Sequence, residues 1–251
     1  MPALIFDCDG VLADTERDGH LPAFNAAFAE FGLPIVWSPD DYAKLLQIGG
    51  GKERIASVLD DGSFTSHGMA TDPQGRAELL RRLHLRKTEL FKARVEQGLL
   101  PGRPGIARLI AEALGSGWTV AVASTSAPAS VKAVLSHAVG PELAGRVHVF
   151  AGDIVAAKKP APDIYLKVLA DLALDPSQCV VIEDSAIGLR AASAAGLPTV
   201  VTKSAFTGDE DFDKAVLVLA HLGDPDNPVE HPRLPAAMVR LADLDALIHN
   251  T

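Results

Sequence analysis

The chain has 251 residues, of which 48% are hydrophobic and 22% charged, and it carries a formal net charge of −9 at pH 7. This length is sufficient for one large globular domain or for a core with a smaller companion. The acidic balance argues against nonspecific nucleic-acid binding, which requires a basic surface, so any anionic ligand must meet a local positive site.

Short apolar runs rich in valine and isoleucine alternate with segments of helical character along much of the chain. Strands are predicted at residues 3–7, 118–124, 147–153 and 179–184, with edge strands at 198–203 and 215–220. Helices are predicted at 18–32, 128–139, 162–173 and 185–195. Because strands that alternate with helices form a parallel sheet covered on both faces, the predicted fold class is α/β with a Rossmann-like sheet.

About a hundred residues without a convincing strand separate the first two predicted strands. Helical candidates there are 21–32, 51–59 and 76–97, and in the last of these leucines recur at helical spacing. The polar, glycine-bearing stretch 60–75 is predicted as a loop. We expect this insertion to be an all-helical cap, residues 17–97, and expect residues 1–16 and 98–251 to form the core domain.

The first predicted strand ends in two aspartates, in the stretch ALIFDCDG. Side chains at positions i and i+2 of an extended segment point to the same side, so Asp7 and Asp9 lie together while Cys8 points into the core. Crowded carboxylates cost free energy unless a cation or hydrogen-bond donors compensate. The pair therefore indicates a metal site or acid–base chemistry.

Polar groups also follow three other predicted strands: Ser124 with Thr125, Lys159, and Glu183 with Asp184. The carboxyl ends of parallel strands meet at one edge of a sheet, where such sheets bind ligands. Carboxylates can hold Mg²⁺, a lysine and hydroxyl groups can hold phosphate oxygens, and an aspartate can attack phosphorus. This set of groups indicates phosphoryl transfer.

In these motifs the chain resembles the haloacid-dehalogenase superfamily of phosphohydrolases. The motifs occur in order as DCDG (7–10), the serine of VAVAST, the lysine of AAKKPAPDIY, and VIEDSAIG (181–188). The resemblance implies that Asp7 is the nucleophile that forms an aspartyl-phosphate. It implies that Asp9 protonates the leaving oxygen and then deprotonates the attacking water.

The same resemblance implies a Mg²⁺ site and a phosphate site. Mg²⁺ would be held by Asp7, the backbone carbonyl of Asp9 and Asp184, with Glu183 as a further or outer ligand. The groups expected to hold the phosphoryl oxygens are Lys159, Ser124, the N–H of Thr125, and Ser126.

Each assignment has a purely structural alternative. Asp184 could cap the helix that follows it, and Ser124 and Ser126 could be turn or cap residues. Of the adjacent Lys158 and Lys159, one is expected to be solvated, and the KPAPDIY spacing favours Lys159 for the site.

The insertion resembles the cap of the β-phosphoglucomutase-like group, and more narrowly the chain resembles CbbY-type phosphatases. The matching stretches are DTERDGH, LLQIGGGKERI, LHLRKTELF and the core from FAGDIVAAKKPAPDIY onward. This resemblance implies a metabolite-repair enzyme of carbon fixation that converts xylulose-1,5-bisphosphate, an inhibitory by-product of Rubisco, to xylulose 5-phosphate. The implied substrate-binding residues of the cap are Glu16, His20, Tyr42, Gly50, Gly51, Lys52, Arg54 and Lys87.

The cap residues also have structural alternatives. His20 and Tyr42 could be packing residues, Arg54 could pair with a neighbouring carboxylate, and 81–87 could be a solvated helix face. The glycines before Lys52 do not form a Walker loop because the spacing fails, and they are better explained as a tight turn that opens a helix.

Other functions remain open on this sequence. A β-phosphoglucomutase-type mutase would use the same Asp7 and Asp9, and a phosphatase for another small sugar phosphate would differ only in its cap. From a different class, a signalling receiver domain gathers similar groups around Mg²⁺, but it would be about half this length and would lack the cap.

The chain offers no membrane or disulfide signal. No apolar run approaches the roughly 18 residues of a membrane span, and the first predicted strand begins at once. Cys8 and Cys179 lie in strand-like runs, which fits buried thiols in a reducing compartment. We expect a monomer in the cytoplasm, or in the chloroplast stroma if a transit peptide has been removed.

Overall fold

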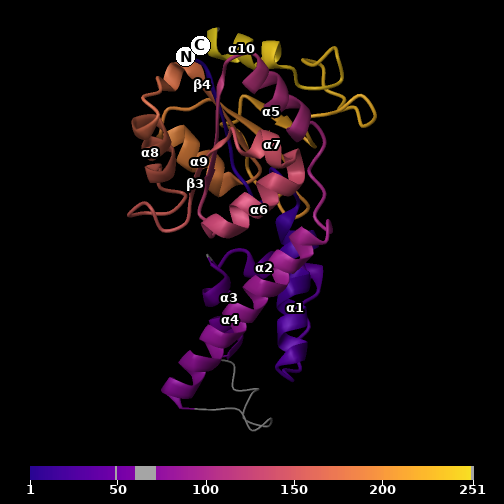
Figure 1. The fold of residues 1–251 in the computed structure, drawn as a ribbon, viewed down its shortest axis with the longest axis vertical. Coiled ribbons are helices and arrows are strands. Elements are labelled where there is room, and N and C mark those ends of the chain that lie inside the picture. Colours follow the sequence, from indigo (N-terminus) through magenta and orange to yellow (C-terminus); the bar gives the residue numbers. More distant parts are fainter. Residues whose placement is uncertain (49, 60–71, 250–251) are drawn as a thin grey trace. The chain divides into compact units, whose positions relative to one another are not determined.

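The computed structural model describes residues 1–48, 50–59 and 72–249. Contacts divide the chain into two compact units (Figure 1). The core unit comprises Met1–Thr15 and Leu100–Thr251, and the helical unit comprises Glu16–Leu99. Each unit is described by itself below.

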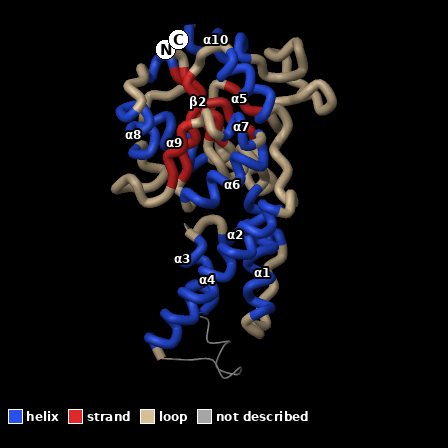
Figure 2. The backbone as a smooth tube through the Cα atoms, in the orientation of Figure 1, coloured by secondary structure: helices blue, strands red, loops and turns tan. Residues whose placement is uncertain are grey.

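The core unit contains a six-stranded parallel sheet, as predicted (Figure 2). In chain order the strands are β1 (Ala3–Phe6), β2 (Thr119–Ser124), β3 (His148–Ala151), β4 (Cys179–Glu183), β5 (Thr199–Thr202) and β6 (Leu217–Leu219). Their order across the sheet is β3-β2-β1-β4-β5-β6. The chain runs from β1 towards one edge and then from β4 towards the other, so the switch point at which such sheets bind ligands lies between β1 and β4.

One predicted position in the sheet is wrong. β5 is not an edge strand, because it pairs with both β4 and β6. The edges are β3 and β6. All four residues of β5 are buried, as expected of a strand with neighbours on both sides. A short apolar run does not reveal how many neighbours it has, so sequence alone could not decide this point.

Helices cover the sheet of the core unit. They are α5 (Ile106–Gly115), α6 (Pro128–Val139), α7 (Pro141–Ala144), α8 (Asp163–Asp171), the 3₁₀ helix Pro176–Gln178, α9 (Ala186–Ala194) and α10 (Leu241–His249). Ile164 and Val168 of α8 pack with Ile5 of β1 and Val181 of β4 in one hydrophobic cluster. Helix α5 contacts β2, helix α10 contacts β4, and the two helices contact each other. Helices α5, α7 and α10 were absent from the predicted elements.

The described part of the helical unit contains helices and no strand. The helices are a π-helix (Glu16–His20), α1 (Leu21–Glu30), α2 (Pro39–Leu45), α3 (Gly51–Leu59) and α4 (Pro73–Glu96). Helix α4 begins at Pro73 because the Asp72 carboxylate caps it, accepting the N–H of Gly75 at 2.7 Å. The predicted loop is therefore wrong at 73–75, and residues 60–71 of that prediction lie outside the described residues.

Among the described residues, no helix combines the length and the apolar character that crossing a bilayer requires.

Candidate active site

Asp7 lies at the carboxyl end of the central strand β1 beside a buried lysine. Its backbone N–H donates to the carbonyl of Ile182 in β4, which fixes the residue at the switch point. Nζ of Lys159 donates to Oδ1 of Asp7 at 2.6 Å and to the carbonyl of Ala123 at 3.1 Å. Lys158 instead forms an exposed ion pair with Asp153. The structure thus brings Lys159, and not Lys158, to the nucleophile candidate.

Glu183 ends β4 and holds Lys159 from the other side. Its Oε1 accepts a hydrogen bond from Lys159 at 2.7 Å and from the Tyr165 hydroxyl at 2.5 Å, and its Oε2 accepts the N–H of Asp184. A Cβ at Gly188 would lie 2.0 Å from Oε1, so only glycine leaves room for this carboxylate. Both oxygens of Glu183 are therefore engaged, and the residue is built to orient the lysine.

Asp9 is held by two hydroxyl groups. Its Oδ1 accepts a hydrogen bond from Thr15 at 2.6 Å, and its Oδ2 accepts one from Ser126. Ser124, at the end of β2, accepts the N–H of Ser126, which shapes the turn that presents the Ser126 hydroxyl, and Thr125 is half-buried between them. Because a hydroxyl can donate to a carboxylate and accept from a carboxylic acid, this cradle suits both protonation states of Asp9.

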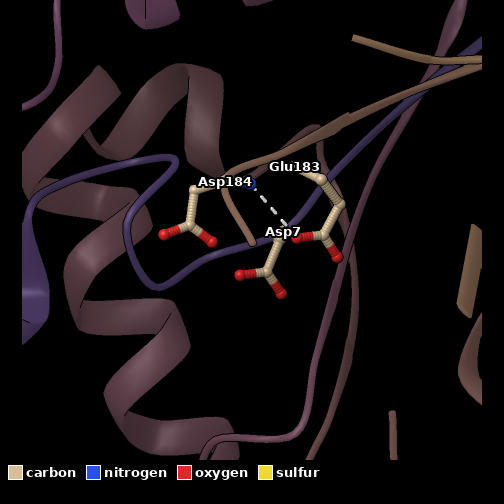
Figure 3. A group of neighbouring side chains, drawn as sticks. All are labelled: Asp7, Glu183 and Asp184. Atoms are coloured by element: carbon tan, nitrogen blue, oxygen red, sulfur yellow. Dashed lines mark hydrogen bonds between the residues drawn. The ribbon is translucent and has the colours of Figure 1, made fainter. Parts of the chain in front are cut away.

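Three carboxylates converge at this edge of the sheet: Asp7, Glu183 and Asp184 (Figure 3). One oxygen of each lies within 4.8 Å of the others, and all three residues are buried. The structural alternative for Asp184 fails, because the cap of α9 is Ser185, whose hydroxyl accepts the N–H of Gly188 at 3.1 Å. The placement of Asp184 is thus explained by the cluster and not by the helix.

The charges of this cluster are strongly perturbed. Burial raises the pKa of Asp7 to about 7, Lys159 opposes the rise, and the carboxylates Glu183 and Asp9 add to it. Burial, together with Glu183 and Asp7, raises the pKa of Asp184 well above its usual range. Although burial disfavours the charged amine, Asp7 and Glu183 hold the pKa of Lys159 well above its ordinary value. When the three carboxyl groups are ionised, their negative charge exceeds the positive charge of Lys159, and an all-oxygen donor set of this kind fits a hard divalent cation such as Mg²⁺.

We expect Asp7 to make the metal-free protein less stable as the pH rises. The folded protein holds the Asp7 proton more tightly than the unfolded chain, where the pKa is near 3.8. The stability from this group is therefore complete below that value and is lost as the pH rises through about 7. A Mg²⁺ ion bound by Asp7 would compete with the proton, so added Mg²⁺ should raise the melting temperature more at about pH 8 than at about pH 5.

Thermal unfolding with chelator and with Mg²⁺ across this pH range checks the expectation. The Asp7→Asn variant is the control because it lacks the titrating group. If the stability of wild type and variant has the same pH dependence, Asp7 is not the responsible carboxyl.

The helical unit holds a second polar group, made of Glu16, Tyr42 and Arg54. The Tyr42 hydroxyl donates to Oε2 of Glu16 at 2.5 Å, and Nη1 of Arg54 donates to the Tyr42 oxygen at 2.9 Å. Arg54 also forms an ion pair with Glu16 at 3.4 Å. Both alternatives raised for these residues are therefore realised, since Tyr42 is buried beside Trp37 and Phe24 and Arg54 has a carboxylate partner.

His20 and Lys87 meet in the same helical unit. Nζ of Lys87 lies 2.9 Å from Nδ1 of His20 and 4.3 Å from the ring centroid of Phe24, and the His20 ring stacks on Phe91. Lys87 is 6% exposed, whereas the side chain of Arg81 on the same helix is 62% exposed, so only part of 81–87 is a solvated face. Lys87 is thus a buried cation that lies against His20 and the rings of Phe24 and Phe91.

Of the glycine stretch at the start of α3, Gly50 and Gly51 lie within the described residues, and Gly49 lies outside them. Gly50 has φ +100°, a conformation that glycine adopts readily, and Gly51 is the first residue of α3. A Cβ at Gly51 would approach the Phe24 ring to 3.3 Å. Lys52 is exposed on the first turn of the helix, where backbone N–H groups favour an anion.

Two residues of the core site were missed by the sequence analysis. Thr15 directly follows Asp14 in the DTERDGH stretch. It is separated from Asp9 by six positions of sequence, and no spacing rule predicts a contact between the two. Tyr165 closes the KPAPDIY stretch, where it reads as an apolar position of a helix. It is one of only two tyrosines in the chain and is fully buried, which requires a partner for its hydroxyl.

Comparisons with known proteins identify the family of the chain. The model of the haloacid dehalogenase-like hydrolase family matches residues 1–196. A CBBY-like protein of Arabidopsis thaliana is 50% identical over 89% of this chain and 70% of its own length, and the plasmid-encoded CbbY protein of Cupriavidus necator is 47% identical over 98% and 95%.

Solved structures give the same result. The crystal structure of Rhodobacter sphaeroides CbbY in complex with phosphate has a TM-score of 0.77 and 38% identity, over 98% of this chain and 100% of that chain. A mutant of that protein in complex with xylulose-1,5-bisphosphate has a TM-score of 0.73 and 40% identity, over 88% and 95%. The chain therefore belongs to the haloacid dehalogenase-like hydrolases and, within them, to the CbbY proteins.

Proposed function

We propose that the chain is a magnesium-dependent phosphatase that converts xylulose-1,5-bisphosphate to xylulose 5-phosphate. The observation that carries the chemistry is the position of Asp7, which is held by Lys159 at the switch point of the sheet and within 4.8 Å of Glu183 and Asp184. The substrate rests on the similarity to Rhodobacter sphaeroides CbbY, which was crystallised with that bisphosphate.

Asp7 and Asp9 would divide the reaction into two steps. A carboxylate oxygen of Asp7 attacks phosphorus, the bond from phosphorus to the sugar oxygen breaks, and protonated Asp9 gives its proton to that oxygen. Asp9, now a carboxylate, takes a proton from water as the water attacks the aspartyl-phosphate, which releases phosphate and restores Asp7. The hydroxyls of Thr15 and Ser126 hold Asp9 in both states.

The remaining residues of the core would place the phosphoryl group. Lys159 supplies a fixed positive charge, and Ser124 and the N–H of Thr125 supply hydrogen bonds to its oxygens, while the Ser126 hydroxyl is engaged by Asp9. Mg²⁺ would be held by Asp7, Asp184 and the backbone carbonyl of Asp9, and would neutralise charge on the phosphoryl oxygens. Glu183 would act through Lys159, since both of its oxygens are engaged.

The polar residues of the helical unit would recognise the rest of the substrate. A second phosphate suits the exposed Lys52 at the start of α3 and the buried Lys87 beside His20. The network of Glu16, Tyr42 and Arg54 offers carboxylate, hydroxyl and guanidinium groups for the sugar hydroxyls. Gly50 and Gly51 would let the backbone approach the ligand.

We expect Lys52→Ala to reduce kcat/KM on the bisphosphate by about ten- to a hundredfold, because a hydrogen bond to a charged group contributes about 1.5–3 kcal/mol. Hydrolysis of an aryl monophosphate, which has no second phosphate, should change little. Lys44→Ala in α2 is the matched control, since Lys44 is exposed and paired with Asp41 at 3.9 Å. Equal losses on both substrates would contradict the role of Lys52.

A substrate panel tests the proposal. Phosphate release is measured, with Mg²⁺ and with chelator, from xylulose-1,5-bisphosphate, ribulose-1,5-bisphosphate, fructose-1,6-bisphosphate and β-glucose 1-phosphate. Strong preference for the first supports the proposal. Conversion of β-glucose 1-phosphate to glucose 6-phosphate without free phosphate would move the protein to the mutase alternative, which uses the same Asp7 and Asp9.

The proposed substrate gives the enzyme a role in carbon fixation. Removing an inhibitory by-product of Rubisco is metabolite repair, so we propose that the protein acts where Rubisco does, in the cytoplasm of a bacterium or the stroma of a chloroplast.

A further inference from the structure

Arg103 lies in the segment by which the chain re-enters the core unit. Its backbone N–H donates to the carbonyl of Leu12 at 2.9 Å, and the neighbouring Gly102 forms an antiparallel bridge with Ala13. The returning segment is thus paired with the loop that directly follows Asp7 and Asp9.

The Arg103 side chain donates to carbonyl oxygens of three separate segments. Nη1 donates to the carbonyl of Gly10 and, at 3.0 Å, to that of Thr202 at the end of β5. Nη2 donates to the carbonyls of Lys203, at 2.6 Å, and Ala220, which follows β6. The planar guanidinium can satisfy several acceptors at once in a fixed geometry, which a lysine cannot.

Gly10 connects this arginine to the active site. It follows Asp9, has φ +77°, and lies so close to Asp184 that an added Cβ would be 2.0 Å from Oδ2. The Gly10 turn is therefore held by Arg103 at its carbonyl, and it leaves no room for a Cβ beside the Asp184 carboxylate.

We propose that Arg103 is a positioning residue of the phosphatase reaction, which fixes the Gly10 turn and with it the relative placement of Asp9 and Asp184. This inference rests on the proposed function. Loss of the guanidinium leaves the Gly10 carbonyl without its donor and lets the turn shift. A misplacement of about 1 Å of catalytic groups can reduce the rate by about a hundredfold.

The test compares Arg103→Ala and Arg103→Lys with Arg108→Ala. Arg108 is a matched control because its Nη2 also donates to backbone carbonyls, those of Gly223 and Val239 at 2.8 Å, in the C-terminal tail and not in the Gly10 turn. All variants are assayed on the bisphosphate well below their melting temperatures. The rise in melting temperature on adding Mg²⁺ is measured as a readout independent of turnover.

For Arg103→Ala we expect kcat to fall about 10- to 100-fold with KM changed less than about threefold, because the group acts on the transition state through Asp9. Added guanidinium ion should restore part of kcat, and Arg103→Lys should be intermediate. The rise in melting temperature with Mg²⁺ should shrink, because Asp184 is less well placed. Arg108→Ala should change neither kcat nor this Mg²⁺ effect.

Unchanged kcat in a folded Arg103→Ala, a change in KM alone, or an equal loss in Arg108→Ala would overturn the proposal. If Arg103→Ala does not fold, Arg103→Lys decides, and wild-type kcat in that variant overturns it. Wild type, assayed in parallel, distinguishes a failure of the Arg103 inference from a failure of the proposed function. If wild type releases no phosphate, the proposed function fails, and the Mg²⁺ effect on melting still shows whether Arg103 positions Asp184.

Discussion

Asp7→Asn is expected to abolish phosphate release from every substrate that wild type hydrolyses, with a loss of at least about 10³-fold. The amide has nearly the shape of the carboxylate but cannot attack phosphorus, so no aspartyl-phosphate forms. Lys159 keeps its second partner, Glu183, at 2.7 Å, and the fold should survive. Steady-state phosphate release, with circular dichroism and thermal unfolding as checks of folding, measures this effect.

A surface aspartate provides the matched control for this substitution. Asp153 is paired with Lys158 at 2.9 Å, as Asp7 is with Lys159, but its side chain is 87% exposed. Asp153→Asn should leave turnover at the wild-type level. A folded Asp7→Asn variant that retains more than about a hundredth of wild-type activity would refute the nucleophile assignment.

Asp9→Asn is expected to lower kcat on the sugar bisphosphate by about 10²–10⁴-fold, because the leaving oxygen and the attacking water both lose their proton-transfer partner. An aryl phosphate has a leaving group that departs without a proton. For that substrate the first step should survive while hydrolysis of the aspartyl-phosphate remains slow. Rapid mixing should therefore show a burst of aryl alcohol equal to the enzyme concentration, followed by slow turnover.

Ser126→Ala separates the acid–base role of Asp9 from its placement. The variant keeps the carboxyl group and its Thr15 partner at 2.6 Å but removes the Ser126 hydroxyl. We expect a smaller loss than in Asp9→Asn, and no burst. If Asp9→Asn slows both substrates equally and gives no burst, Asp9 does not act as the general acid.

The core of the site could be predicted because parallel strands bring their carboxyl ends to one edge. Asp7 and Asp184 directly follow the adjacent strands β1 and β4, so the strand pattern alone places them together. The order of the strands could not be predicted in full, since β5 is an interior strand only because it pairs with β6, which comes from later in the chain.

Residues that act through others were harder to predict. Tyr165 and Arg103 hold Glu183 and Gly10 across 18 and 93 positions of sequence, and no spacing rule connects them. Tyr165 offers one signal, since a buried tyrosine hydroxyl must find a partner. In the helical unit, Lys87 and His20 meet only because α4 packs on α1 and the π-helix, which helical periodicity alone does not fix.

The most direct test of the central claim is product analysis with xylulose-1,5-bisphosphate as the only substrate, followed by phosphorus NMR with Mg²⁺ and with chelator. The account predicts that Mg²⁺ gives xylulose 5-phosphate and inorganic phosphate in equal amounts, and that the chelator stops both. Formation of an isomeric sugar phosphate without inorganic phosphate, or undiminished turnover in chelator, would contradict it.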